Sequence, residues 1–508
     1  MESFVLGRDE AHISDVVSVA RGHREVHLSP SAHKCMQRSR EYIEGLVEER
    51  AVVYGVTTGF GNFCETHISQ EQARELQQNL IRSHAVAVGE PLSEEVVRGA
   101  IFLRALALSR GHSGVRPAVV ELLIGMLNAG VIPLVPQQGS LGASGDLAPL
   151  AHMALVMIGE GQATFDNRLM PGASALERAG LEPLTLEARE GLALINGTQI
   201  MTALGALAVA DGEVLCHSAD VVAALTLEAL RGIKDAFDPR VSQLRPHPGQ
   251  GEVARRIREV TCGSTLVTRQ GEICVQDPYS LRCIPQVHGA VRDALAYITA
   301  VVGRELSAVT DNPLVFPGED VLSGGNFHGE PVALALDHLA LAMAELGNIS
   351  ERRTNRLLHP AYNRGLPAFL TTRGGLNSGL MIAHYTAASL ASENKLLAAP
   401  ASADSIPTSA GQEDHVSMGA TAARKARSSV RNLSRILAVE AMTAAQALDL
   451  RAEQDGEMGL NPGRGTEAAY QWIRARVDRV EQDRSLSQEV QDLGDALVGG
   501  DMLRWMSG

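Results

Sequence analysis

Four long stretches of this chain are apolar and contain no internal proline, and they constrain the fold more than any other feature. Alanine, leucine and valine dominate them, and only 4% of the chain is aromatic, so small side chains must fill the interior and let helices pack closely. Such segments are typical of long helices in a bundle, where each helix is apolar on most faces. They are Thr198–Ala236, Val287–Asn312, Pro331–Leu358 and His415–Arg451. We therefore expect a mostly α fold in which residues 201–508 form a long-helix bundle with C-terminal helices as a cap.

Residues 1–200 carry shorter elements and are expected to form an N-terminal domain. Ser93 is a typical N-cap for a helix that ends at Gly111. The stretch Ala163–Met170 predicts a hairpin that turns at Asp166-Asn167. Five segments rich in Gly, Pro, Asn and Ser are expected to be loops, where catalytic groups usually lie. These segments are Val53–Cys64, Gln137–Pro149, Asp238–Tyr279, Pro313–Glu330 and Ala399–Asp414.

Charge and cysteine pattern argue against several classes of protein. A net charge of −14 without a long basic run disfavours nucleic-acid binding. The start, Met1–Glu10, lacks the pattern of a signal peptide, and the longest mostly apolar runs, such as Leu147–Ile158, are expected to be too short to cross a bilayer. The six cysteines are scattered without zinc spacing, and His23 and His27 have no third ligand. We therefore expect reduced thiols in a cytoplasmic protein, with no metal and no membrane partner.

The segment Gly139–Leu147, GSLGASGDL, is the most unusual in the chain. It precedes an apolar, helix-like run, so one interpretation is a tight turn that caps a helix. The other interpretation is chemical. The nitrogen of Gly145 is an unhindered nucleophile, and its attack on the Ala143 carbonyl, with loss of water from the ring and from Ser144, would leave a conjugated methylidene. Such a group is an electrophile that no ordinary side chain offers.

Together with six further motifs, this segment resembles the histidine and aromatic amino-acid ammonia-lyase family over roughly residues 5–480. The resemblance implies that Ala143, Ser144 and Gly145 become a methylidene-imidazolone ring, so that no external cofactor is needed. It also implies a homotetramer with each active site built from several chains. The motifs are VVYGVTTGFGNF at 52–63, LIRSHA at 80–85, GSLGASGDLAPLAH at 139–152, LALINGTQ at 192–199, VQDPYSLRCIPQVHG at 275–289, SGGNFHGE at 323–330 and SIPTSAGQEDHVSMG at 405–419.

The resemblance assigns roles to three residues: two tyrosines are candidates for removing the substrate β-proton, and one arginine binds the substrate carboxylate. Tyr54 and Tyr279 are expected to line the site, and one of them removes the substrate β-proton; the sequence does not say which. A tyrosine needs nearby positive charge or a helix N-terminus to act as a base at neutral pH, and a structural tyrosine is the alternative. Arg282 follows Tyr279 by one helical turn, and its planar fork suits the substrate carboxylate. A salt bridge to a neighbouring acid is the alternative for Arg282.

Three further residues are expected to contact the ring or the substrate. Asn196 and Gln276 can hold the ring carbonyl or the amine, although amides at helix ends are often simple caps. Phe327 resembles a pocket wall, and a plain core phenylalanine is its alternative.

His84 and Glu413 indicate the substrate. Glu413 precedes a long helix, where an acid in the first turn is expected in any case. In this family, however, the segment QEDHVSMG accompanies histidine as substrate, and the Ser83-His84 pair fits the same pattern. A carboxylate can hold an imidazole N–H, whereas a phenyl ring would leave that carboxylate buried and unpaired. The predicted reaction is therefore the conversion of L-histidine to trans-urocanate and ammonia, a step of histidine catabolism. Ala87 departs from the glycine that histidine enzymes often have there, which bears on the placement of His84.

Three other functions stay open at this point. The first is a tyrosine or phenylalanine ammonia-lyase or 2,3-aminomutase of the same family, which Glu413 disfavours. The second is a catalytically inactive helical scaffold, which the complete set of site residues disfavours. The third is a hydrolase that uses Ser144, which has no G-x-S-x-G elbow because Asp146 occupies the last position.

Overall fold

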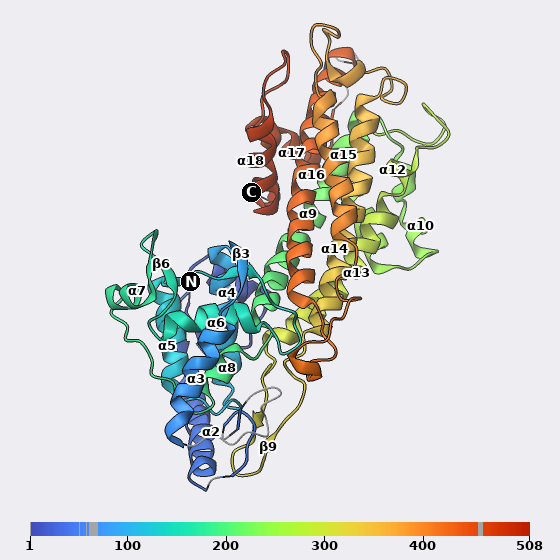
Figure 1. The fold of residues 1–508 in the computed structure, drawn as a ribbon. Coiled ribbons are helices and arrows are strands. Elements are labelled where there is room, and N and C mark those ends of the chain that lie inside the picture. The colour runs from blue at the N-terminus through green and yellow to red at the C-terminus, as the bar shows by residue number, and fades with distance from the viewer. Residues whose placement is uncertain (1, 50, 57, 60–69, 456–460, 508) are drawn as a thin grey trace. The chain divides into compact units, whose positions relative to one another are not determined.

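The computed structural model describes residues 2–49, 51–56, 58–59, 70–455 and 461–507, and it is mostly α-helical, as expected (Figure 1). Contacts divide the chain into two compact units. The first comprises residues 1–207, 299–337 and 400–424, and the second comprises residues 208–298, 338–399 and 425–508. The expected domains 1–200 and 201–508 stay a prediction. The motif at 52–63 lies partly outside the described residues, as does Cys64.

The core of the first unit is the helix α4 (Glu94–Ser109), which is buried along almost its whole length. It follows Ser93 as predicted, and Gly111 turns the chain with a φ of 74° just after its end. Helices α5 (Pro117–Ala129) and α6 (Leu147–Met157) complete this core. The other helices of the unit are α1 (Ile13–Ala20), α2 (Pro30–Glu48), α3 (Gln70–His84), α7 (Gly172–Arg178) and α8 (Glu190–Ile195), with a 3-10 turn at Ser409–Gly411.

Short strands connect these helices and position the glycine-rich segment. The predicted hairpin is confirmed, because Phe165 pairs with Arg168 around Asp166 and Asn167, whose φ values of 49° and 58° suit a tight turn. The glycine-rich segment runs from β5 to α6, so a strand and a helix fix its two ends. The strand pairs are β1 (Phe4–Leu6) with β2 (Val26–Leu28) in parallel, and, antiparallel, β3 (Val88–Pro91) with β5 (Pro136–Gln138), β6 (Gln162–Phe165) with both β4 (Ile132–Pro133) and β7 (Arg168–Pro171), and β8 (Leu314–Val315) with β9 (Val321–Leu322).

The four predicted long helices are present, and four of the five boundaries between the two units fall within them, while the fifth lies between residues 399 and 400. The first ends at Ala229 rather than Ala236, because Arg231 takes a left-handed backbone with a φ of 51°. The four are α9 (Gln199–Ala229), α13 (Ile284–Leu306), α14 (Glu330–Leu358) and α16 (Gly419–Asp455).

The expectation that the apolar runs are too short to span a bilayer is wrong for two of these helices. By length and composition α9 and α14 could each cross a membrane, with mean hydropathies of 1.3 and 1.4 over their most apolar windows. These windows are 78% and 72% buried inside the protein, as in core helices. Burial within the bundle therefore accounts for their apolar character.

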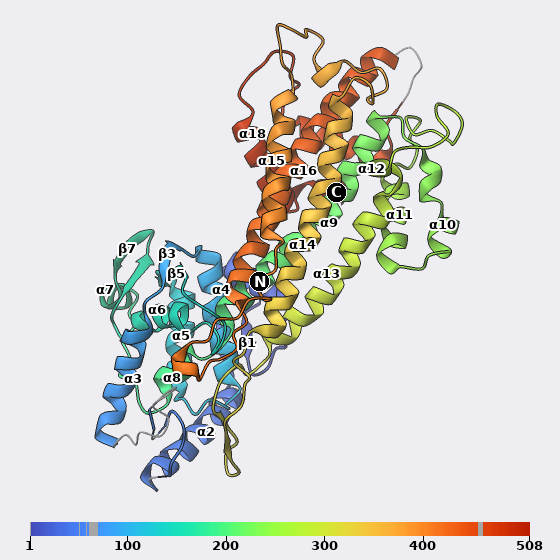
Figure 2. The same cartoon turned by 45° about the vertical axis from the view of Figure 1, so that its right-hand side comes forward.

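In the second unit, α14, α15 (Met381–Leu397) and α16 run side by side in both views (Figures 1 and 2). Ala387 and Ala391 of α15 pack against Ile436 and Val439 of α16. Buried polar contacts also join the helices, because the carboxylate of Glu440 on α16 accepts hydrogen bonds from Thr226 on α9 and Ser350 on α14, at 2.8 and 2.6 Å. The remaining helices of the unit are α10 (Pro239–Gln243), α11 (Pro248–Val260), α12 (Tyr279–Arg282), α17 (Arg464–Arg474), α18 (Ser487–Val498) and α19 (Asp501–Ser507), with 3-10 turns at Lys234–Phe237 and Ala368–Leu370.

The segment Asp238–Tyr279, expected to be a loop, contains α10 and α11, so that prediction is wrong over these residues. Pro239 and Pro248 stand in the first turns of the two helices, where a missing N–H costs nothing. The same prolines that indicated a loop therefore mark helix starts.

Candidate active site

The glycine-rich loop between β5 and α6 has a backbone that other residues could not adopt. Gly145 has a φ of 75°, and a Cβ at this position would lie 2.2 Å from the carbonyl oxygen of Gly197. The backbones of these two glycines are bridged in parallel, and the amide of Asp146 donates to the Gly197 carbonyl at 2.7 Å. The loop therefore lies directly against the segment that follows α8.

Asp146 fixes the end of this loop where α6 begins. Its buried carboxylate accepts hydrogen bonds from the hydroxyl of Ser140 at 2.8 Å and from the amide of Met201 at 2.9 Å. Burial nevertheless raises the pKa of Asp146 to about 6, because the loss of water outweighs these hydrogen bonds. Asp146 was not among the predicted site residues, although an acid just before an apolar helix is a typical N-cap.

A second chain segment holds the middle of the loop. The hydroxyl of Ser417 donates to the carbonyl of Gly142 at 2.9 Å, and the amide of Met418 donates to the carbonyl of Leu141 at 2.7 Å. The amide of Gly329 also donates to the carbonyl of Gly142, at 3.0 Å. These contacts bring the motifs at 139–152, 323–330 and 405–419 together.

A cavity of about 220 Å³ is lined by this loop and by two predicted substrate residues, His84 and Glu413. The side chain of Ser144 faces Glu413, and its hydroxyl donates to Oε1 of the carboxylate at 2.8 Å. The described part of the lining also includes Ser83, Val86, Ala143 and Ala148. The structure thus gathers five of the predicted site residues at one cavity, namely His84, Ala143, Ser144, Gly145 and Glu413.

Glu413 is held by its own turn rather than by a helix. Its backbone forms an antiparallel bridge with Thr408, and the Thr408 hydroxyl donates to Oε2 at 3.2 Å. The helix α16 begins only at Gly419, so Glu413 is not a first-turn acid of that helix. The carboxylate is therefore positioned toward the cavity, and Thr408 is a supporting residue that the sequence analysis missed.

His84 ends helix α3 and is half-buried. Burial lowers the pKa of His84 below its ordinary value, while a hydrogen bond to Leu80 and the negative charge of Glu413 oppose this effect less strongly. Its Nδ1 lies 3.1 Å from the hydroxyl of Ser83. The neighbouring Ala87 keeps a backbone outside the left-handed region, and its amide donates to Nε2 of His152 at 3.2 Å. Alanine in place of glycine therefore introduces no strain there.

Asn196 contacts the proposed ring-forming triplet directly. It is the C-cap of α8, and its Nδ2 donates to the carbonyl of Ser144 at 3.0 Å. Its other amide atom, Oδ1, is buried and has no hydrogen-bond partner among the residues that the structure describes. An unpaired buried acceptor is costly, so this atom is suited to receive a donor from a bound molecule.

Tyr54 and Phe327 do not line the cavity among the residues described for it, and both are half-buried. Phe327 lies in the loop between β9 and α14. The motif that carries Tyr54 includes residues 57 and 60–63, which lie outside the described residues. The roles of Tyr54 and Phe327 stay predictions.

Tyr279, Arg282 and Gln276 belong to the second unit. The guanidinium of Arg282 lies over the ring of Tyr279 at 4.6 Å, so the two share one face of α12 as the spacing indicated. Tyr279 is 70% exposed, and Gln276 is exposed too. The buried Asp277 between them anchors the segment by accepting hydrogen bonds from the amide of Ile233 at 2.5 Å and from Arg364 at 2.6 Å. Their part in the site stays a prediction.

Comparison with known proteins agrees with this geometry. The family described as aromatic amino acid lyase matches residues 11–475. Histidine ammonia-lyase of Symbiobacterium thermophilum is 56% identical over 506 residues, which cover 99% of this chain and 98% of that protein. Histidine ammonia-lyase of Caldanaerobacter subterraneus is 55% identical, over 98% of this chain and 97% of that protein.

Solved structures share the whole fold. Histidine ammonia-lyase from Trypanosoma cruzi matches with a TM-score of 0.91 and 42% identity, covering 99% of this chain and 95% of that one. Tyrosine aminomutase from Streptomyces globisporus matches with a TM-score of 0.94 and 38% identity, covering 99% and 98%. The chain belongs to the aromatic amino acid lyase family and is a carbon–nitrogen lyase.

Proposed function

We propose that this chain is a histidine ammonia-lyase, which eliminates ammonia from L-histidine to give trans-urocanate. The observation that carries the proposal is the Glu413 carboxylate, which faces the same cavity as His84 and Ser144. A carboxylate and a neutral imidazole can pair with both nitrogens of a substrate imidazole. The relatives named histidine ammonia-lyase support this substrate, since they are 56% and 55% identical whereas the tyrosine aminomutase is 38% identical.

We propose further that Ala143, Ser144 and Gly145 form a methylidene-imidazolone ring, with no external cofactor and no metal. The residues present fit this ring. Gly145 has a left-handed backbone and no space for a side chain, and Asn196 donates to the Ser144 carbonyl, which would become the ring carbonyl. The ring supplies an electrophilic carbon, which is the chemistry that makes an amine a good leaving group.

The other residues bind the substrate and move a proton. Glu413 accepts the imidazole N–H, and His84 pairs with the other side of that ring. Arg282 binds the substrate carboxylate through its planar fork, and Gln276 and the free Oδ1 of Asn196 accept hydrogen bonds from the amine. One of Tyr54 and Tyr279 removes the β-proton, and Phe327 forms a wall of the pocket.

We propose that the protein is a cytoplasmic homotetramer with active sites shared between chains. Support comes from large apolar side chains that are exposed on α13, α14 and α15 in the second unit, because contact between chains would remove this apolar surface from water. These side chains include Tyr297, Leu341, Ile382, Tyr385 and Leu396. The five described cysteines are unpaired, as expected in a reducing compartment.

A tyrosine or phenylalanine lyase or aminomutase is the second candidate, because the tyrosine aminomutase shares the fold with a TM-score of 0.94. A serine hydrolase is disfavoured, because Ser144 donates to a carboxylate rather than to a histidine. Analysis of the products formed from L-histidine tests the proposal. We expect trans-urocanate and ammonia in equal amounts. A β-amino acid without ammonia would identify an aminomutase, and no product would favour an inactive scaffold.

A further inference from the structure

The ring-forming triplet rests on a two-residue segment, Asn196-Gly197. Asn196 donates to the Ser144 carbonyl at 3.0 Å, and Gly197 lies so close to Gly145 that a Cβ on Gly145 would lie 2.2 Å from the Gly197 carbonyl oxygen. A small displacement of this segment would therefore move the Ser144 carbonyl and the Gly145 nitrogen, which both take part in ring closure.

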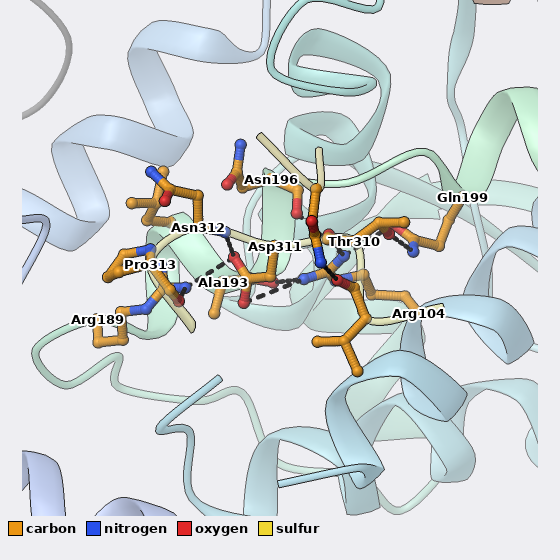
Figure 3. Close-up of polar contacts among 12 residues, drawn as sticks. Arg104, Arg189, Ala193, Asn196, Gln199, Thr310, Asp311, Asn312 and Pro313 are labelled. Atoms are coloured by element: carbon orange, nitrogen blue, oxygen red, sulfur yellow. Dashed lines mark hydrogen bonds and ion pairs between the residues drawn. The ribbon is translucent and has the colours of Figure 1, made fainter. Parts of the chain in front are cut away.

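A buried arginine holds this segment from the opposite side. Arg104 of α4 donates through Nη1 to the Asn196 carbonyl at 3.3 Å, to the Thr310 carbonyl at 3.3 Å and to Oε1 of Gln199 at 2.8 Å (Figure 3). Its Nη2 donates to the carbonyl of Ala193 in α8. A Cβ at Gly197 would lie 2.3 Å from Nη1, so the guanidinium fills the space directly behind this glycine.

An ion cluster fixes the guanidinium of Arg104 in turn. Nη2 of Arg104 lies 3.8 Å from Oδ2 of Asp311, and Arg189 at the start of α8 lies 2.7 Å from Oδ1 of the same carboxylate (Figure 3). All three side chains are at most 1% exposed. Burial lowers the pKa of Arg104 only to about 10, so it stays a cation at neutral pH. Asp311 therefore connects both ends of α8 through two arginines.

This ion cluster is not expected to add much to the free energy of unfolding. Buried ion pairs lose their hydration, and replacing them with apolar residues is often neutral or stabilising. Nε of Arg104 and Nε of Arg189 are buried without a hydrogen-bond partner among the described residues. What the cluster does provide is three directed hydrogen bonds that hold the end of α8 and the residues after it, and a fourth that ties them to the Thr310 carbonyl.

We propose that Arg104 is a positioning residue for formation of the cofactor ring, acting through Asn196-Gly197. The inference rests on the proposed function. In ring closure the Gly145 nitrogen bonds to the Ala143 carbonyl carbon; the carbonyl oxygen leaves as water with the hydrogens of the Gly145 and Ser144 nitrogens. The Ser144 hydroxyl then leaves as a second water with the Ser144 Cα hydrogen, and the Cα–Cβ double bond forms. Asn196 favours this last loss, because its hydrogen bond withdraws electrons from the carbonyl next to that Cα. Arg104 is fully buried and contacts no reacting atom.

The test measures ring formation itself rather than turnover. The full chain is made by cell-free synthesis, synthesis is stopped, and the intact mass is followed over time for wild type, Arg104→Lys and Arg104→Gln. Arg98 offers a matched control on the same helix. It is 2% exposed, and its hydrogen bonds go to the carbonyls of Val19 and Leu127. Arg98→Lys and Arg98→Gln therefore report the general cost of changing a buried arginine in α4.

We expect wild type and both Arg98 variants to lose the mass of two water molecules at similar rates in the folded fraction. Both Arg104 variants should lose it at least about tenfold more slowly, as expected for losing one hydrogen bond to a charged group. Arg104→Lys keeps the charge without the fork, so it decides the outcome if Arg104→Gln does not fold. Equal rates for Arg104→Lys and Arg98→Lys would overturn the role of Arg104 alone. A wild-type chain that never loses the two waters would instead overturn the proposed cofactor.

Discussion

Replacing Glu413 with glutamine removes the negative charge from the cavity and keeps the size of the side chain. In the structure Oε1 accepts from the Ser144 hydroxyl at 2.8 Å, and Oε2 accepts from Thr408 at 3.2 Å. The proposed ring formation would eliminate the Ser144 hydroxyl and leave Oε1 available to a substrate N–H. A hydrogen bond to a charged group contributes about 1.5–3 kcal/mol, and its loss should lower kcat/KM for histidine about 10- to 150-fold.

The assay is steady-state formation of urocanate, followed by its ultraviolet absorbance, with the intact mass measured on the same sample. Glu413→Gln should still show the loss of two waters, because the glutamine oxygen can accept the same hydrogen bond from Ser144. The neighbouring exposed Asp414 provides the control, and Asp414→Asn should retain wild-type kcat/KM. Wild-type kcat/KM for histidine in Glu413→Gln would refute the role of this carboxylate. A missing ring would instead show that Glu413 acts in maturation.

Three further predictions concern other residues of the site. Ser144→Ala should keep the helical circular dichroism spectrum and lose nearly all activity and the two-water mass loss, since a methyl group cannot become a methylidene; near-normal turnover would contradict the mechanism. Arg282→Ala should weaken transition-state binding by about 2–5 kcal/mol in kcat/KM, and Arg282→Lys should recover only part of it; unchanged kinetics would make Arg282 structural. Asp146 has a folded pKa of about 6, above the ordinary aspartate value of 3.8, so the folded state binds this proton more tightly than the unfolded state does. The stabilising contribution of the bound proton therefore fades as pH rises from about 4 to 6. The free energy of unfolding of wild type relative to Asp146→Asn should therefore fall by about 3 kcal/mol over that range in urea titrations, and a rise would contradict the sign.

Much of the fold follows from local sequence patterns. Apolar composition without proline was enough to predict the long helices, and Asp166-Asn167 was enough to predict the hairpin. The predicted element boundaries were wrong where a residue type is compatible with more than one local structure. Pro248 begins α11 although proline also marks loops, and Arg231 ends α9 in a left-handed backbone that its residue type does not favour.

Candidate site residues could be predicted only where they lie within the long sequence motifs. His84, Ser144, Asn196 and Glu413 were identified from their motifs, and the structure brings them to one loop and cavity. Arg104 could not be found in this way, because it lies outside the seven motifs. Its importance lies in the backbone carbonyls that it reaches, those of Ala193 and Asn196, which are 89 and 92 residues away along the chain.

Whether this lyase acts on histidine can be decided by measuring kcat/KM for L-histidine, L-tyrosine and L-phenylalanine. A cavity whose polar groups pair with an imidazole leaves those groups buried and unpaired when a phenyl ring binds. We predict a preference for histidine over phenylalanine of roughly 10⁴-fold or more, and a strong preference over tyrosine. A higher kcat/KM for tyrosine or phenylalanine would contradict the assignment of the substrate and leave only the family in place.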